Sequence, residues 1–327
     1  MKRIVFRVEG NNKVGMGHTF TPLRIADKIK DEIEVLFVMS SESKLGMNVV
    51  KDRGYNVKEV DFDDIKSQIE LIKEYNPNVV FNDLLYANKA YMELLKENNI
   101  FIINMEHSQE TDTRNIANVV INSLYPGSRK EYYYGPKYAL LSDSYKNLPK
   151  RILNKENKRI FVCFGGSDLN SLTLKTVNAL KDSNLELDIV MVPNFKYKNE
   201  LEKINSDYEN VNLHEGLSDL SKLMLNADVG IVSGGYTSFE CAATGLPILV
   251  LAQNELEDNR NKLFVEFGTS VYLGLGTKIL EEELRNEVNK LNSDYNLREK
   301  MNKKGQELVD GKGLDRVVDI VKRNFNE

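Results

Sequence analysis

Short apolar runs alternate with segments of helical periodicity along most of this 327-residue chain. In the first half, these runs predict strands at residues 4–8, 35–39, 79–82, 100–104 and 119–121. Many of the runs are unbroken, as expected when helices cover both faces of a parallel sheet. The pattern therefore predicts an α/β fold with doubly wound parallel sheets.

A change of composition separates the two halves of the chain. Between residues 125 and 158, proline, glycine and a lysine-rich patch interrupt the periodicity, which predicts a linker. A second series of predicted strands follows, at residues 160–164, 187–192, 211–214, 229–232, 248–251 and 271–273. We therefore expect two Rossmann-like domains that face each other across a cleft, with an amphipathic helix at residues 314–325.

The amino-acid composition bears on which classes of molecule this protein could bind. The net charge is −5, and the sequence lacks a basic patch interleaved with aromatic residues, which argues against nucleic acid as the main partner. Because no run of 18 apolar residues and no signal peptide is found, we expect a cytoplasmic protein without a membrane span.

Cys163 and Cys241 are expected to be buried and inert. The three histidines lie far apart, so the sequence shows no metal motif.

The first glycine-rich loop follows the predicted strand at residues 4–8. Gly15 and Gly17 allow a tight turn and a close approach to a ligand, because neither carries a Cβ atom. His18 lies where the next helix begins, and the positive end of the helix dipole disfavours a protonated imidazole there. The position suits a base or a hydrogen-bond donor, although a capping histidine would give the same pattern.

A Gly-Gly turn follows the first strand of the second series. Gly165, Gly166 and Ser167 precede a helix, and N–H groups at the start of a helix suit a phosphate. Such turns are also common in α/β folds without a ligand.

A second turn carries more chemistry. Gly234 and Gly235 follow another strand, and Thr237 and Ser238 lie where hydroxyl groups could cap the next helix or hold a phosphate. The carboxylate of Glu240, one turn further on, could accept hydrogen bonds from both hydroxyls of a ribose. The alternative is a capped helix with a solvated glutamate.

Polar side chains follow two further predicted strands. Gln253 and Asn254 could bind sugar hydroxyls or N-acyl groups, although such residues are normal in a connecting loop. Glu106 and His107 follow the strand at residues 100–104 and are minor candidates for facing the cleft.

Together these motifs resemble a known family. They occur in order over nearly the whole chain, as Gly15-Met16-Gly17-His18, the turn at residues 164–168, Tyr138-Ala139-Leu140-Leu141, Ser233-Gly234-Gly235-x-Thr237-Ser238-x-Glu240, Ala252-Gln253-Asn254 and Asp310-Gly311-Lys312-Gly313. They are similar to the nucleotide-sugar hydrolases of pseudaminic acid biosynthesis and to the related spore-coat polysaccharide proteins. That group is in turn similar to the GT-B glycosyltransferases.

The resemblance implies a GT-B-like pair of domains. The N-terminal domain, residues 1–148 rejoined by the helix at 314–327, would supply the catalytic loop, and residues 149–313 would bind UDP. His18 maps onto the catalytic histidine of the hydrolases, which helps water to attack the anomeric carbon without a metal or another cofactor.

The remaining site residues follow from the same resemblance. Glu240 maps onto the ribose-binding glutamate of the GT-B group. The diphosphate turn of that group maps onto Gly234, Gly235, Thr237 and Ser238. Four further residues are expected in the catalytic loop or near the sugar: Gly15, Gly17, Thr19 and Asn254. The chain departs from the family pattern at Asn104-Met105-Glu106-His107 and at Glu255, so the identity of the sugar stays open.

The sequence thus predicts a metal-independent UDP-sugar hydrolase. Its expected substrate is a UDP-2,4-diacetamido-2,4,6-trideoxyhexose or a similar amino-deoxy sugar, destined for a nonulosonic acid or a surface glycan. Two alternatives stay open: a GT-B glycosyltransferase in which His18 activates an acceptor hydroxyl, and a non-catalytic subunit that binds a nucleotide sugar.

Overall fold

A computed structural model describes residues 1–11, 14–107, 112–127, 129–156, 158–165, 168–191, 195–217 and 219–325. Contacts divide the chain into two compact units, Met1–Ser142 with Lys312–Glu327, and Asp143–Gly311. The domain boundaries expected from the sequence fall after residues 148 and 313. The contacts place both boundaries a few residues earlier, after Ser142 and Gly311. Within the described residues, no helix is both long and apolar enough to cross a membrane.

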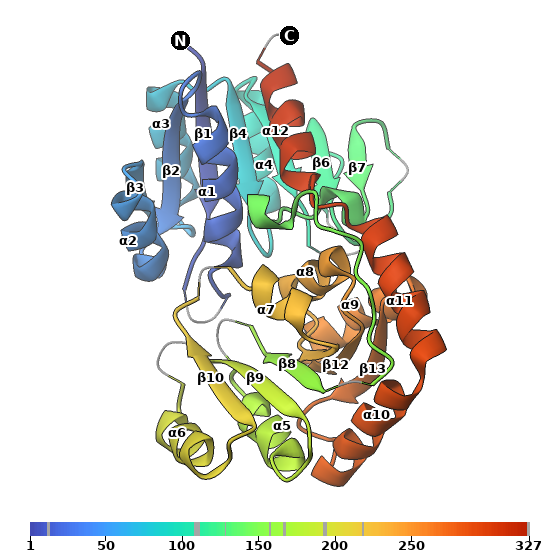
Figure 1. Cartoon of the computed structure of the whole chain (residues 1–327). Coiled ribbons are helices and arrows are strands. Elements are labelled where there is room, and N and C mark those ends of the chain that lie inside the picture. The colour runs from blue at the N-terminus through green and yellow to red at the C-terminus, as the bar shows by residue number, and fades with distance from the viewer. Residues whose placement is uncertain are drawn as a thin grey trace. The chain divides into compact units, whose positions relative to one another are not determined.

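The first unit is built on a parallel sheet, which has seven strands within the described residues, in the order β3-β2-β1-β4-β5-β6-β7 (Figure 1). The strands are β1 (Arg3–Val8), β2 (Glu34–Ser40), β3 (Asn56–Val60), β4 (Val79–Asp83), β5 (Phe101–Met105), β6 (Val119–Asn122) and β7 (Tyr132–Tyr134). The helices of this unit are α1 (Gly17–Ile29), α2 (Lys44–Asp52), α3 (Ile65–Tyr75), α4 (Lys89–Glu97) and α12 (Gly313–Arg323).

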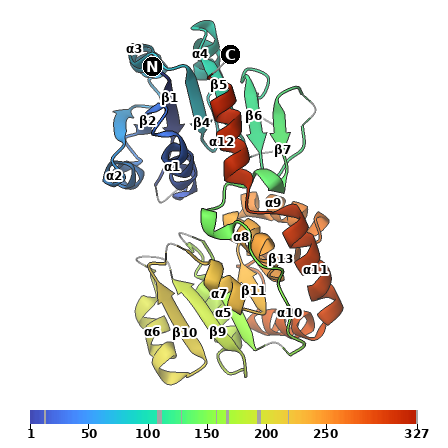
Figure 2. The ribbon, with the colours of Figure 1, turned by 45° about the horizontal axis from the view of Figure 1, so that its top comes forward.

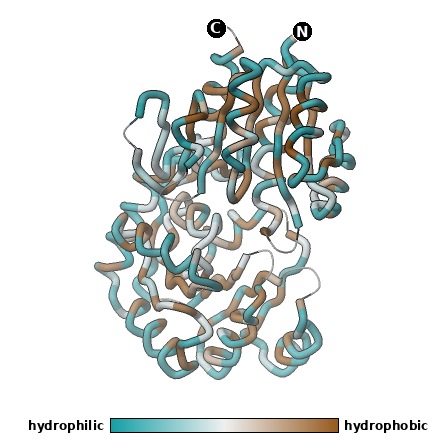
Figure 3. Tube along the Cα trace, turned by 180° about the vertical axis from the view of Figure 1, so that it is seen from behind, coloured by the Kyte–Doolittle hydropathy of each residue, from teal (hydrophilic) through white to brown (hydrophobic). Residues whose placement is uncertain are grey.

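Both faces of this sheet are buried. Ile4 and Phe6 of β1 pack in one apolar cluster with α1, α2 and α12, whereas Val5 packs in another with α3 and α4. Since neighbouring residues of a strand point to opposite faces, most residues of a central strand are apolar on both faces. This explains the unbroken apolar runs of the sequence, which colour the central strands brown in Figure 3.

The second unit repeats this plan. Its parallel sheet has six strands within the described residues, in the order β10-β9-β8-β11-β12-β13. They are β8 (Arg159–Cys163), β9 (Glu186–Met191), β10 (Val211–Glu215), β11 (Val229–Val232), β12 (Ile248–Ala252) and β13 (Ser270–Leu275). The helices are α5 (Leu172–Leu180), α6 (Lys198–Asp207), α7 (Ser221–Asn226), α8 (Tyr236–Thr244), α9 (Glu255–Glu266), α10 (Glu281–Ser293) and α11 (Tyr295–Leu308).

Both sheets reverse their strand order at one place. In the first unit the chain runs outward from β1 to β3 and then returns to the other side of β1 with β4, and in the second unit β8 and β11 stand in the same relation. Loops that leave such neighbouring strands diverge, and ligands of α/β proteins bind in the space between them. The topology thus points to the carboxyl ends of β1 and β4 and of β8 and β11.

The sequence prediction missed two edge strands. β3 has mostly exposed residues, and β7 has none that is fully buried, so neither gives an unbroken apolar run. The predicted linker at residues 125–158 was therefore partly wrong, since β7 lies inside it and pairs with β6. An edge strand has one neighbour and one open side, which leaves a weaker apolar signal.

The last helix belongs to the first unit. α12 lies in the first unit (Figure 2) and contacts α1. Its residues Leu314, Val317 and Ile320 are buried in the cluster that includes Ile4 and Phe6 of β1. The chain therefore closes the core of the first unit with residues that come more than 300 positions after its first strand.

The packing of α12 can be tested with two variants of the same helix. Ile320 is 2% exposed, so Ile320→Ala should lower the opening free energy of the first unit by about 2–5 kcal/mol. Asp319→Ala, at an exposed neighbouring position, should change it by less than about 0.5 kcal/mol. Hydrogen exchange of α1 and β1 peptides measures both effects, and equal protection in the two variants would contradict the packing role.

Candidate functional site

The loop after β1 is a tight turn that places His18 at the start of α1. The Gly15 N–H donates to the Asn11 carbonyl oxygen at 2.9 Å, and Asn11 Oδ1 accepts a bond from the Val14 N–H at 3.1 Å. Gly15 has a φ of +80°, a left-handed conformation that a side chain would strain. Because α1 begins at Gly17, His18 lies in its first turn, as predicted.

Thr19 follows His18 in the first turn of α1. Its side chain is fully buried, and its Oγ1 donates to the Glu9 carbonyl oxygen at 2.9 Å. A buried hydroxyl needs such a partner, and this one ties the helix to the end of the strand. Thr19 therefore braces the loop from inside, and its contact with a sugar stays a prediction.

Asp83, the last residue of β4, binds both histidines of the first unit. His18 Nδ1 and His107 Nε2 each lie 2.7 Å from Asp83 Oδ1. The two imidazole rings meet edge to face, with centroids 4.6 Å apart. The Asp83 side chain is 1% exposed, and those of His18 and His107 are 12% and 10% exposed. The three side chains form one polar cluster that is closed around the carboxylate.

The charge state of this cluster follows from its environment. Burial acts to raise the pKa of the Asp83 carboxyl, but the charges and hydrogen bonds of His107 and His18 outweigh it and hold that pKa below its ordinary value. An ionised carboxylate only accepts hydrogen bonds, so each ring nitrogen that faces it carries a proton. In a neutral His18 ring, Nε2 is then the nitrogen that can accept a proton. A buried carboxylate that orients a histidine in this way is a common arrangement for a general base.

The sheet explains why three distant residues meet. β4 pairs with β1 on one side and with β5 on the other, and Asp83 stands level with Val8 and Met105. His107 follows β5 by two residues, and His18 lies in the loop and helix that follow β1. The sequence analysis missed Asp83, because the strand was predicted to end one residue earlier. The available signal was a carboxylate directly after a buried strand of a parallel sheet.

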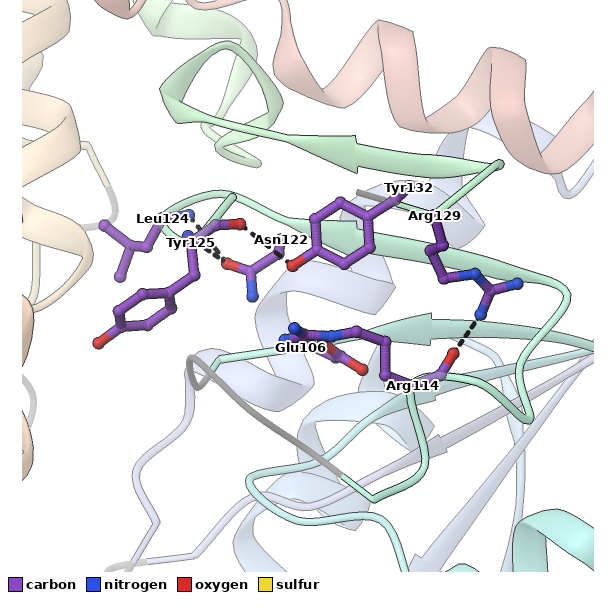
Figure 4. A network of polar contacts seen from close by, with 7 residues as sticks. All are labelled: Glu106, Arg114, Asn122, Leu124, Tyr125, Arg129 and Tyr132. Carbon is purple, nitrogen blue, oxygen red and sulfur yellow. Dashed lines mark hydrogen bonds and ion pairs between the residues drawn. The ribbon is translucent and has the colours of Figure 1, made fainter. Parts of the chain in front are cut away.

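Glu106, a minor candidate from the sequence, takes part in a structural network (Figure 4). It is 3% exposed, and its Oε2 lies 2.8 Å from Arg114 Nε and 2.7 Å from Arg114 Nη2. The Arg114 guanidinium lies 5.1 Å from the centroid of the Tyr132 ring, whose hydroxyl donates to the Tyr125 carbonyl oxygen at 3.1 Å. The network joins the carboxyl ends of β5 and β6 to β7 and holds the backbone that carries His107.

In the second unit, the two predicted glycine turns lie side by side. β8 pairs with β11, and a Cβ atom added to Gly165 would lie 3.6 Å from Ser233 Oγ. The other predicted residues of the first turn, Gly166 and Ser167, lie outside the described residues.

A carboxylate and an amide fix the surroundings of the first turn. Asp168 accepts hydrogen bonds from the N–H groups of Leu172 and Thr173, at 2.8 and 3.0 Å, where α5 begins. Gln253 Nε2 donates to Asp168 Oδ1 at 2.8 Å, which links the end of β12 to this turn. The strand end and the helix start are therefore held together by charge-assisted bonds.

The second turn leads directly into α8. Its cap residue, Gly235, has no side chain with which to cap the first N–H groups of the helix, and the backbone of the preceding Gly234 hydrogen-bonds the Glu257 carboxylate. Thr237 is buried, and Ser238 Oγ donates to the Ser233 carbonyl oxygen at 3.1 Å, so a bond from Ser238 to phosphate would break this contact. Glu240 lies one turn further along and is half-buried.

Two other expectations have a structural outcome. Asn254 caps α9, where its Oδ1 accepts a bond from the Glu257 N–H at 3.0 Å, and its contact with a sugar stays a prediction. Cys163 and Cys241 are free and buried, and burial raises the pKa of Cys163 to about 12 and that of Cys241 well above its usual value. Neither thiol is therefore ionised near neutral pH, in agreement with the prediction that they are inert.

Comparison with curated proteins gives three relatives, and no family model matches the chain. The chain is 29% identical over 278 residues to an uncharacterized protein of Methanocaldococcus jannaschii, covering 78% of this chain and 56% of that protein. It is 26% identical over 334 residues to the spore coat polysaccharide biosynthesis protein SpsG of Bacillus subtilis, covering 98% and 97%. It is 23% identical over 240 residues to the UDP-2,4-diacetamido-2,4,6-trideoxy-beta-L-altropyranose hydrolase of Campylobacter jejuni, covering 71% and 84%.

Solved structures show the fold. MurG of Acinetobacter baumannii is similar with a TM-score of 0.75 and 15% identity, over 99% of this chain and all of MurG. The calicheamicin glycosyltransferase CalG4 is similar with a TM-score of 0.73 and 13% identity, over 100% and 98%. S. aureus MnaA in a co-structure with UDP is similar with a TM-score of 0.65 and 15% identity, over 100% and 97%. The predicted GT-B-like fold of two parallel-sheet domains is confirmed.

The second turn gives a prediction with a matched control. A Cβ atom added to Gly234 would lie 2.2 to 2.5 Å from the side-chain amide of Asn261, which is fully buried. Gly234→Ala should therefore destabilise the second unit by about 1–3 kcal/mol through overpacking. Gly235→Ala should cost less, because the nearest contact there is 3.9 Å from the added atom. Thermal unfolding of both variants measures the difference, and equal melting temperatures would contradict it.

Proposed function

We propose that this protein hydrolyses a UDP-linked amino-deoxy sugar to the free sugar and UDP, in the biosynthesis of a nonulosonic acid or a surface glycan. The substrate would be of the 2,4-diacetamido-2,4,6-trideoxyhexose type. The observation that carries the proposal is the buried Asp83 carboxylate, 2.7 Å from His18 Nδ1, which orients His18 as a base. The names of the B. subtilis and C. jejuni relatives, a polysaccharide biosynthesis protein and a UDP-sugar hydrolase, give further support.

The reaction needs a base, an attacking water and a stabilised leaving group. The water oxygen attacks C1 of the sugar, its proton passes to His18 Nε2, and the C1–O bond breaks so that UDP leaves with the bonding electrons. Asp83 stabilises the imidazolium that forms, because it already accepts the bond from Nδ1. General base catalysis of this kind contributes about 10²- to 10⁴-fold in rate. No metal takes part in these steps.

The second unit would bind the nucleotide. The backbone at the start of α8, at Gly234, Gly235 and Thr237, would hold the diphosphate, together with the turn at Gly165. Glu240, one turn into α8, would accept hydrogen bonds from the ribose hydroxyls. MnaA, which shares the fold, has been solved in a co-structure with UDP.

The alternative is a glycosyltransferase of the same fold. It is favoured by the structural likeness to a calicheamicin glycosyltransferase, and His18 would then deprotonate an acceptor hydroxyl instead of water. Incubation with a panel of UDP-amino-sugars separates the two. UDP release from the donor alone supports hydrolysis, whereas release only after an acceptor is added overturns it in favour of transfer.

The role of His18 can be tested by substitution. His18→Asn keeps a polar side chain of similar size but cannot take up a proton. The rate of UDP release should fall by at least about 10²-fold, while UDP affinity stays nearly unchanged, because the nucleotide contacts belong to the other unit.

The third histidine of the chain provides the control. His214 Nε2 lies 2.9 Å from Asp188 Oδ1 in the second unit, so His214→Asn breaks a similar pair away from the proposed base. It should release UDP at the normal rate. If His18→Asn melts early but turns over normally, His18 is a structural cap and its catalytic role is wrong.

The ribose contact gives a separate prediction. Glu240→Ala should weaken UDP binding by about 1.5–3 kcal/mol, the usual worth of hydrogen bonds to a charged group. Glu266→Ala removes the same charge from an exposed position at the end of α9 and should leave the affinity unchanged. Calorimetry with UDP compares the two, and an unaltered affinity in Glu240→Ala would move the ribose elsewhere.

A further inference from the structure

Two imidazoles and one carboxylate converge on a single point of the first unit. The facing atoms of His18, Asp83 and His107 all lie within 4.8 Å of one another. Two ring nitrogens share one carboxylate oxygen, and among the described residues the second oxygen, Oδ2, is buried without a hydrogen-bond partner. The carboxylate therefore has unused capacity to bind a cation.

We propose that His18, Asp83 and His107 form a binding site for a divalent transition-metal ion. Two histidines and one carboxylate are a known ligand set for such ions, and imidazole favours zinc or cobalt over magnesium or calcium. Asp83 ends β4, His107 lies two residues beyond β5, and His18 lies in the first turn of α1 after β1, so the pairing of these neighbouring strands fixes their spacing. The Glu106–Arg114 ion pair holds the backbone next to His107.

The two N···O distances would need a small adjustment to hold this ion. Ligand atoms bound to a tetrahedral zinc ion at about 2.1 Å lie about 3.4 Å apart. The present N···O distances are 2.7 Å, so each imidazole would retreat from the carboxylate by less than an ångström. Both histidine side chains are partly exposed, which leaves access for the ion and for water as a further ligand.

Metal binding would block the base, and this consequence rests on the proposed function. The ion takes the lone pair of His18 Nδ1, and the proton that was on Nδ1 is then on Nε2. A neutral ring with its proton on Nε2 cannot accept another from water. The same cluster would thus serve as a base without the ion and be inactive with it.

The binding test uses the full chain without a polyhistidine tag, after treatment with a chelator. Titration with Co²⁺, followed by its visible absorption, should show one ion per chain. His107→Asn should weaken binding by at least about tenfold, whereas His214→Asn, which leaves the cluster intact, should bind as the unaltered protein does. Equal binding in His107→Asn, or no binding by the unaltered protein, would overturn the site.

A second measurement does not depend on any variant. In the unaltered protein, Zn²⁺ should shift the ¹⁵N resonance of His18 Nδ1 and move the ring proton to Nε2. Unchanged His18 resonances at saturating Zn²⁺ would place the ion elsewhere and overturn the assignment.

A measurement of UDP release separates the metal-site proposal from the hydrolase proposal. UDP release by the chelated protein should stop when Zn²⁺ is added and return when the ion is removed, and the residual activity of His107→Asn should be less sensitive to Zn²⁺. Release that continues with the ion bound overturns the blocking role alone. Metal binding by a protein that never releases UDP supports the site and overturns the hydrolase.

Discussion

The parallel arrangement of the strands is the constraint on which both units depend. Successive parallel strands need a crossover connection, which is usually a helix, and such helices bury both faces of the sheet. All strands then end at the same edge, and polar residues beyond the apolar runs meet there. Asp83 ends β4 and His107 lies just beyond β5, while Gly165 and Gly234 follow β8 and β11 in the same manner. The strand order thus determines which polar residues can act together.

The Asp83 carboxylate is the most demanding group in the first unit. A charge that is 1% exposed is costly unless it is compensated, and two imidazole N–H groups supply the compensation. The same bonds fix the orientation of His18. Asp83 therefore contributes to local stability and would prepare His18 as the base of the proposed reaction, and its interactions with His107 add the possibility of metal binding. The Glu106–Arg114 pair supports this arrangement from the adjacent strand end.

The second unit differs, because the role proposed for its turns depends on backbone N–H groups and not on a base. Its turns are shaped by hydrogen bonds within the protein. Ser238 Oγ donates to the Ser233 carbonyl oxygen, and Gln253 Nε2 donates to Asp168. The backbone at Gly234 packs closely against the fully buried side chain of Asn261, which leaves no room for a side chain at this position. In the proposed function, these contacts would preorganise a site for the diphosphate, which would lower the cost of binding it.

The sequence by itself determined the fold class, most of the strands and the two loops that carry His18 and Gly234. Those features are local, since burial on both faces gives unbroken apolar runs and tight turns select glycine. The exposed edge strands β3 and β7 were missed because they bury too little. Only the tertiary structure decided that Thr19 and Ser238 use their hydroxyls inside the protein, because a cap, a buried brace and a ligand contact look alike in sequence. It also decided that the Asp83 carboxylate lies within hydrogen-bond distance of both His18 and His107, which are 65 and 24 residues away from it in the sequence. No local pattern encodes that meeting, because the pairing of β4 with β1 and β5 produces it.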